Sequence, residues 1–163
     1  MRTLAVLAVI FVIVPLLLLA AGQFGLLRGK APDDLGVRDG KLKPPSKTEN
    51  SVSSQASLWK DGEFAAESAA IEPLKVRGDP AAALAKLKAT LAARRDVRIV
   101  TDRPDYLHAE FETRWLRFTD DVEFWIDPAA NVIQVRSASR IGRKDFGVNR
   151  ARIESIRVTA NSL

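Results

Sequence analysis

Apolar and polar positions alternate along the second half of this 163-residue chain. Between residues 106 and 115 the odd positions are mainly apolar, whereas the even positions are Tyr106, His108, Glu110, Glu112 and Arg114. A period of two is typical of a strand that is buried on one face. The alternation recurs over residues 121–126 and 132–138, and the turn residues between these two runs predict a hairpin.

The polar sides of these runs are expected to share one surface. Asp121 and Glu123 lie on the polar side of the second run, and Arg136 lies on the polar side of the third. A slip of one residue turns every side chain of a strand to the other face, so this surface forms only if the registers agree.

Helix signals precede and follow the strands. Asp79 as N-cap and Pro80 at the first helical position predict a helix with one apolar stripe, Leu84, Leu87 and Leu91. Asn149 is the expected cap of a terminal helix with the buried stripe Ile153, Ile156 and Ala160. With a further strand starting at Val97, the order predicts an α+β fold: an antiparallel sheet of about four strands with helices packed on one face.

Charge is divided along the chain. The net charge of +5 and the pI of about 9.8 would by themselves suggest a nucleic-acid partner. However, residues 102–127 carry eight acidic and three basic side chains, and residues 136–157 carry seven basic and two acidic ones. These halves are expected to attract each other, and the chain has no zinc-finger spacing or aromatic-glycine motif. We therefore expect no nucleic acid among the partners.

The N-terminus predicts a membrane segment. Residues 4–21 are apolar throughout, and the apolar character resumes up to residue 27. This length can span a bilayer, and Pro15 within it is tolerated in membranes. The alternative is a signal peptide cut near Gly22, because Ala20 and Gly22 place small residues where a signal peptidase reads. We expect an uncleaved anchor, since about 18 apolar residues exceed the usual core of a signal peptide.

Composition then divides the chain and limits its chemistry. Residues 1–27 are the predicted anchor or signal segment, 28–60 a linker and irregular loop rich in Pro, Ser, Gly and Lys, and 61–163 the α+β domain. The chain has no cysteine and one histidine. Disulfides, thiolate chemistry and zinc sites built from several histidines are thereby excluded, and we predict no metal and no cofactor.

His108, Glu110 and Asp121 are the candidate catalytic residues. His108 and Glu110 share a strand face, and Asp121 could lie opposite them, which would bring together a base and carboxylates for acid–base chemistry. The competing interpretation is a network of salt bridges on the sheet, in which Arg136 and Arg140 neutralise the carboxylates. We favour the network, and whether the chain is an enzyme stays open.

The segment from Arg136 to Arg150 supplies the candidate ligand-binding residues: Arg136, Arg140, Asp145, Asn149 and Arg150. Guanidinium groups in such a loop suit an anionic ligand or partner. Asp145 and Asn149 could equally cap the terminal helix, which is the interpretation we favour.

Several blocks of the chain resemble the family called domain of unknown function 1499: LGVRDGKLKP (35–44), SVSSQ (51–55), IEPL (71–74), YLHAEF (106–111), DDVEF (120–124) and VRSASRIGRKDFGVNRARIESIR (135–157). The resemblance implies location rather than chemistry, because relatives occur in bacteria, often behind a membrane segment or signal, and in plant plastids. Relatives usually carry two cysteines before the VSSQ block, where this chain has Pro45 and Ser51. Any staple, metal site or redox function of that pair is therefore absent here.

The function expected from these features is that of a membrane-anchored envelope protein. We expect a non-catalytic binding or scaffolding module, single-pass in the bacterial inner membrane through residues 4–27, with its C-terminal domain on the periplasmic side. Its partner would be an anionic ligand or a protein. The alternatives are secretion to the periplasm after cleavage near Gly22, and a hydrolase or isomerase that uses His108 with Glu110 or Asp121.

Overall fold

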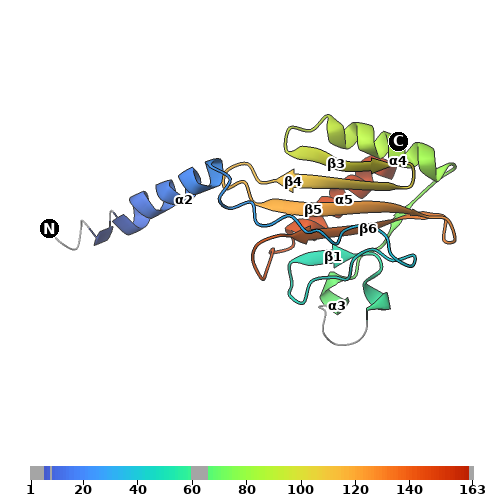
Figure 1. Ribbon diagram of the computed structural model, residues 1–163, viewed down its shortest axis with the longest axis horizontal. Coiled ribbons are helices and arrows are strands. Elements are labelled where there is room, and N and C mark those ends of the chain that lie inside the picture. Colours follow the sequence, from blue (N-terminus) through green and yellow to red (C-terminus); the bar gives the residue numbers. More distant parts are fainter. Residues whose placement is uncertain (1–5, 8, 60–65, 162–163) are drawn as a thin grey trace.

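The computed structural model describes residues 6–7, 9–59 and 66–161. Figure 1 shows one sheet with two long helices against it and a further helix, α2 (Val14–Gln23), that projects from one end. The predicted α+β class is therefore confirmed. A π-helical turn, η1 (Val9–Ile13), precedes α2, and two short helical turns, η2 (Ala56–Leu58) and α3 (Ala66–Ala69), lie before the main domain helices.

The sheet is antiparallel, as predicted, and has six strands where about four were predicted. The predicted strands are β3 (Val97–Arg103), β4 (Tyr106–Glu112), β5 (Thr119–Asp127) and β6 (Val132–Ser139). β1 (Ser51–Ser53) and β2 (Leu74–Lys75) both pair with β6, giving the order β1-β6-β5-β4-β3 with β2 beside β1 on β6. Strands of three and two residues are too short to display a period, which is why the pattern misses them.

One face of the sheet carries the apolar core. Helix α4 (Pro80–Ala92) buries Leu84, Leu87 and Leu91 against it, and α5 (Val148–Asn161) adds Ile153 and Ile156. Asp79 caps α4 as predicted, accepting from the amides of residues 81 and 82. Burial of each leucine contributes about 1.5–3 kcal/mol against roughly 1 for the cap, so packing dominates the position of this helix.

Helix α5 differs from its prediction at the first turn. It begins at Val148, and the Asp145 carboxylate accepts from the amides of Gly147 and Asn149, each at 2.9 Å. The prediction that Asp145 caps this helix is therefore confirmed, whereas the Asn149 side chain, also expected to cap it, points to the sheet. Ala160 of the predicted stripe lies outside the residues whose burial is described.

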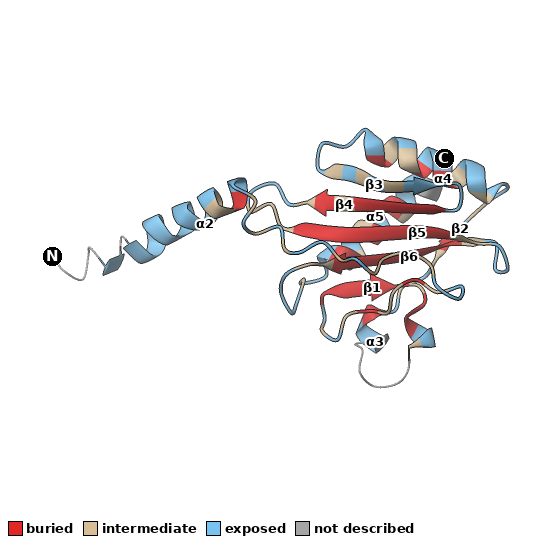
Figure 2. Ribbon diagram, in the orientation of Figure 1, coloured by how far each residue is buried: buried red, intermediate tan, exposed pale blue. Residues whose placement is uncertain are grey.

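The opposite face of the sheet is polar yet also buried. Figure 2 shows β4, β5 and β6 buried along most of their length. Residues 28–50, named the strap below, form no helix or strand and cross this face (Figure 1). Leu42 of the strap packs on Tyr106 and Trp125, and its amide donates to Gln55. The segment predicted as a linker thus closes over the sheet.

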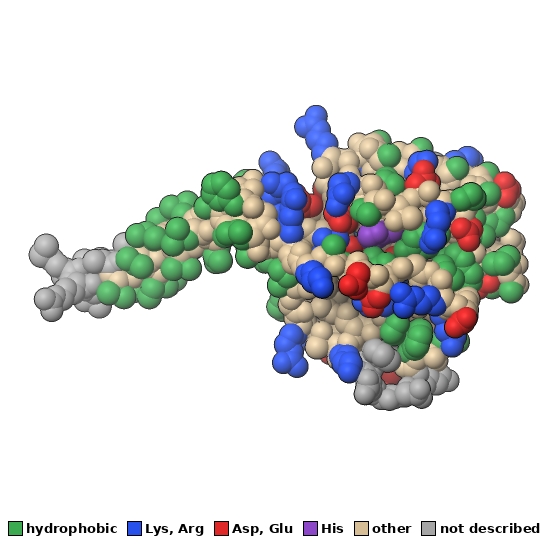
Figure 3. Space-filling model, viewed as in Figure 1, with side chains coloured by type: hydrophobic (Ala, Val, Ile, Leu, Met, Phe, Trp, Pro, Cys, Tyr) green, Lys and Arg blue, Asp and Glu red, His purple; other side chains and the backbone are tan. Residues whose placement is uncertain are grey.

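Helix α2 keeps its apolar side chains outward. Leu16, Leu17 and Leu18 are each about half exposed or more, and Figure 3 shows hydrophobic side chains along the visible side of this helix. Within the described residues we find no helix with both the length and the apolarity that crossing a bilayer demands. Residues 4, 5 and 8 of the predicted anchor lie outside the described part.

Candidate functional site

The polar faces of β4, β5 and β6 align as the alternation requires. Glu110 lies opposite Asp121, His108 opposite Glu123, and Glu123 opposite Arg136. These residues and Arg140, at the end of β6, form one connected set, which we call the polar-face network. Its side chains are almost entirely buried, with Glu123 at 0% exposure.

Arg140 and Asp121 form the centre of the network. Asp121 Oδ2 accepts from Arg140 Nε at 2.8 Å, and its Oδ1 accepts from Arg140 Nη2 at 2.7 Å. His108 Nε2 lies 2.8 Å from the same Oδ1. Arg140 Nη2 also donates to Glu110 at 2.6 Å, and Arg98 donates to the second oxygen of Glu110. All three candidate catalytic residues therefore meet, but each carboxylate already accepts from an arginine.

Glu123 forms the second half of the network. It accepts from the Tyr106 hydroxyl and from the Gly36 amide of the strap, both at 2.8 Å, and from Arg136 Nη1 at 3.4 Å. Arg136 Nε also donates to the carbonyl of Pro44 in the strap. Burial, and secondarily the nearby Glu123 charge, raises the pKa of Tyr106, which keeps this phenol protonated as a donor.

The network holds its carboxylates ionised. Burial opposes ionisation of Asp121, but hydrogen bonds from Arg140 and His108 outweigh burial and lower the Asp121 pKa. Glu110 follows the same pattern, with burial opposed by Arg140 and Arg98 and a lowered pKa as the result. An ionised Asp121 can only accept, so His108 Nε2 carries the proton between them. Both carboxylates are therefore weak bases, and each already accepts hydrogen bonds from an arginine.

A cavity of about 370 Å³ lies beside the network. Asp121, Arg136 and Arg140 line it together with strap residues that include Lys30 and Lys43, whereas His108 does not line it. In the part of the chain that the structure describes, no three imidazole or carboxylate side chains are grouped to hold a metal ion. The cavity therefore presents cations and one carboxylate already paired with Arg140.

The five predicted ligand-binding residues do not converge. Arg136 and Arg140 belong to the network, and Arg150 Nη2 donates to the backbone carbonyls of Ser68 and Ala70. Asn149 is fully buried and bonded to Asn50, Ser137, Ser139, Asp145 and Arg152. Asp145 and Asn149 thus tie the start of α5 to β6 and the strap.

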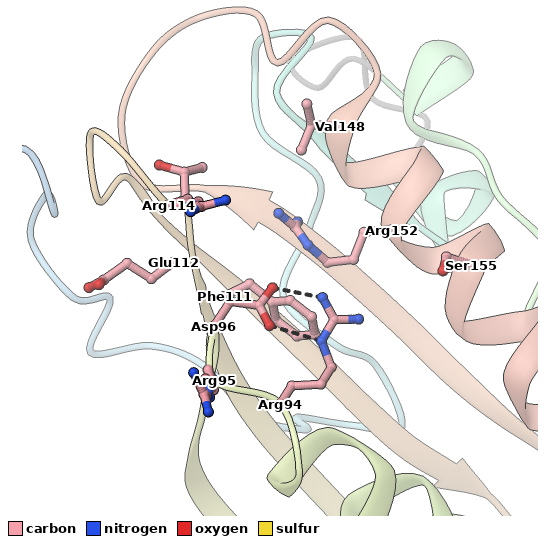
Figure 4. A pocket seen from close by; sticks show the side chains of 10 residues that line it. Arg94, Arg95, Asp96, Phe111, Glu112, Arg114, Val148, Arg152 and Ser155 are labelled. Atoms are coloured by element: carbon pink, nitrogen blue, oxygen red, sulfur yellow. Dashed lines mark hydrogen bonds and ion pairs between the residues drawn. The ribbon is translucent and has the colours of Figure 1, made fainter.

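A larger concavity, of about 920 Å³, lies where the end of α4, the end of β4 and the first turns of α5 meet. Figure 4 shows Phe111 near the middle of the lining residues, with Arg94 and Arg152 close to its ring. Arg95 and Arg114 also line it, and we name it the arginine cleft. No sequence signal singled it out, because its arginines come from three elements that only the fold brings together.

The arginines of this cleft fall into two kinds. Arg94 is held by Asp96 through two hydrogen bonds of 3.0 and 2.7 Å, and Arg152 is held by Asp120, Ser137 and Asn149. Both guanidinium groups also lie over Phe111, at 5.4 and 4.9 Å from the ring centre. By contrast, Arg95 and Arg114 are exposed and make no hydrogen bond or ion pair with any described residue.

In a comparison with models of known protein families, residues 41–159 match the family described as protein of unknown function (DUF1499). The chain belongs to the DUF1499 family. This confirms the resemblance read from the sequence blocks. No curated protein and no solved structure matches this DUF1499 member.

The loop without cysteines is closed by a hydrogen bond in this DUF1499 member. Ser51 is one of the two positions where the resemblance implies a cysteine, and its Oγ accepts from the amide of Ser46 at 2.8 Å. Ser46 directly follows Pro45, the other matching position, and Pro45 is buried. The two ends of the loop therefore meet here without a covalent link.

Proposed function

We propose that this DUF1499 member is a non-catalytic binding or scaffolding module of the bacterial envelope, anchored in the inner membrane through residues 4–27 with its domain on the periplasmic side. The observation that carries the proposal is the pairing of the polar face. Asp121 and Glu110 are neutralised by Arg140, Glu123 is neutralised by Arg136, and the strap bonds to both Glu123 and Arg136.

Catalysis by these groups is disfavoured on physical grounds. A general base works best with a pKa near the operating pH and with a lone pair aimed at substrate. The pKa values of Asp121 and Glu110 are lowered, and their oxygens accept from arginines. His108 directs Nε2 at Asp121. These bonds fit a structural role better than acid–base chemistry.

Contacts at the end of α2 support an anchor that is retained. Gly22 packs so closely on the β4–β5 turn that a Cβ there would lie 2.6 Å from the carbonyl oxygen of Leu116. Gln23 donates to the carbonyl of Trp115, and Arg117 donates to the carbonyl of Gln23. Cleavage before Gln23 would remove the glycine that makes this contact.

Location is tested by fractionating cells that express the full chain. An anchored protein stays with the inner membrane after extraction with alkaline carbonate, and its intact mass is that of the uncleaved chain, 17.9 kDa. Release by carbonate, or a mass lacking residues 1–22, would reject the anchor in favour of a secreted form.

Absence of catalysis is tested with His108→Gln in cells that lack the gene. The Gln side chain can still donate a hydrogen bond to Asp121 but cannot act as an acid or base at neutral pH. We expect full rescue of the deletion phenotype at wild-type protein levels. Loss of rescue by a variant with unchanged abundance and melting temperature would instead support the hydrolase or isomerase alternative.

A further inference from the structure

The arginine cleft opens at the end of the domain where α2 joins it. Glu112 lines the cleft and pairs at 2.9 Å with Arg28, which lies five residues beyond α2. Thr113 and Arg114 continue from the cleft into Trp115, whose carbonyl accepts from Gln23. Figure 3 shows Lys and Arg side chains gathered where the helix meets the domain.

The cleft has an excess of positive charge. Four arginines line it against the two carboxylates of Asp96 and Glu112. Glu112 is already shared between Arg28 and Arg117, and Asp96 is held by Arg94. Arg95 and Arg114 are therefore the cations available to a ligand. Guanidinium groups bind phosphate and carboxylate oxygens through paired hydrogen bonds, which makes an anion the expected ligand.

Hydrogen bonds within the protein hold two of the four arginine side chains in place before any ligand binds. Arg152 is held by Asn149 and Ser137, and its side chain is 11% exposed, while Arg94 is fixed by its two bonds to Asp96. Both guanidinium groups lie over Phe111, which is 3% exposed (Figure 4). A pre-organised wall of this kind lowers the entropic cost of binding.

The rim of the cleft favours a ligand carried by a membrane over a solute. Exposed apolar side chains gather at the same end of the domain: Phe24, Leu26, Trp115, Ile141, Phe146 and Val148. Trp115 contacts α2 through Gln23, Val148 lines the cleft, and Gly29 abuts Ile141. Aromatic and aliphatic side chains mixed with arginines are typical of surfaces at the level of lipid headgroups.

We infer that the arginine cleft binds the phosphate of an anionic phospholipid headgroup in the leaflet that the domain faces. The inference rests on the proposed membrane anchor, which places the cleft at headgroup level. It deepens that proposal by naming the ligand: Arg95 and Arg114 contact the phosphate oxygens, and Arg94 and Arg152 form the wall behind them.

The test is native mass spectrometry of the full-length chain, released from detergent micelles that contain equal amounts of phosphatidylglycerol and phosphatidylcholine with the same acyl chains. We expect phosphatidylglycerol adducts to predominate. Arg95→Gln with Arg114→Gln should reduce that preference about tenfold, because two charge-assisted contacts are lost. Both positions are exposed, so the fold should survive, which circular dichroism checks.

The matched control removes the same charge elsewhere. Arg38→Gln with Arg77→Gln changes two exposed arginines. Arg38 lies in the strap, and Arg77 lies just before the N-terminus of α4, at the opposite end of that helix from Arg95. This variant should keep the preference for phosphatidylglycerol. Equal loss in both double variants, or no preference in the wild type, overturns the inference.

Titration of the same micelles with inorganic phosphate distinguishes the source of the anion. If free phosphate binds, and the Arg95 and Arg114 changes abolish its binding while leaving the lipid adducts unaltered, the ligand is a solute and the lipid assignment is wrong. Carbonate extraction reports separately on the anchor. A chain that stays in the membrane without lipid selectivity rejects the cleft assignment alone.

Discussion

Asp121 illustrates how single residues of the polar face are committed to structure. It is 1% exposed and accepts from His108 once and from Arg140 twice. Breaking a buried pair by removing one partner leaves the other charge without compensation, which is far more costly than losing a surface pair.

Asp121→Asn should therefore lower the free energy of unfolding by about 3 kcal/mol. The amide keeps the size of the carboxylate but turns a donor toward Arg140. Urea unfolding of the detergent-solubilised chain measures the loss. Asp102→Asn is the control, because its pair with Lys88 is solvent-exposed and should contribute under about 0.5 kcal/mol. Similar losses in the two variants would contradict a buried, committed Asp121.

Acid should weaken the fold through the same carboxylates. The pKa values of Asp121 and Glu110 are lowered in the folded chain, so the stability they contribute is present above their unfolded values near 4. It is lost as the pH falls through the lowered pKa values of the folded chain. Unfolding free energies between pH 7 and pH 2 should show this decline, and Glu110→Gln with Asp121→Asn should flatten it. A double variant with the wild-type slope would refute the assignment.

Helix α5 depends at the element scale on one buried amide. Asn149 Nδ2 donates to Asn50 O at 3.1 Å and to Asp145 at 2.8 Å, and its Oδ1 accepts from Ser137 at 2.5 Å. Asn149→Ala should cost about 2–3 kcal/mol, because it leaves several buried groups unpaired. The loss should appear in urea unfolding and as faster hydrogen exchange at the start of α5.

Asp79→Ala provides the comparison, in which a helix loses only a cap. It removes the exposed cap of α4 and should cost about 1 kcal/mol. If Asn149→Ala costs no more than Asp79→Ala, then the buried bonds of Asn149 do not tie α5 to the sheet.

The elements that could be predicted are those whose signal is local. In β4, β5, β6 and α4 the repeat of apolar positions lies within a single stretch of chain. In β4 this repeat of two also places His108 and Glu110 on the same face of the strand. Even the convergence of Asp121 with His108 needed only one added fact, the register of β4 against β5.

Other elements could not be predicted, because their causes are not local. The strap has no period, and its place is set by single bonds such as Gly36 to Glu123 across 87 positions of sequence. Likewise, Arg94 follows helix α4 and Arg152 belongs to α5, and both meet over Phe111. Juxtapositions of this kind depend on the packing of the whole domain.

At the scale of the whole molecule, the C-terminal end of α2 packs directly against the β4–β5 turn. Gly22 leaves no space for a side chain against Leu116, and Gln23 and Arg117 bond across the contact. The exposed Trp115 and the arginine cleft are thereby held close to the apolar helix. An anchored domain would present both to the bilayer surface.

Trp115 offers a direct measure of that geometry. In nanodiscs that hold the full chain, lipids brominated near the headgroup should quench tryptophan fluorescence more than lipids brominated deep in the acyl chain, because aromatic side chains settle at the interface. Trp115 is 64% exposed, whereas Trp125 is buried and Trp59 lies under Lys41 at 5.3 Å. Trp115→Phe should therefore remove most of the quenching, and Trp59→Phe should leave it. Quenching that persists without Trp115 would mean that another surface faces the membrane.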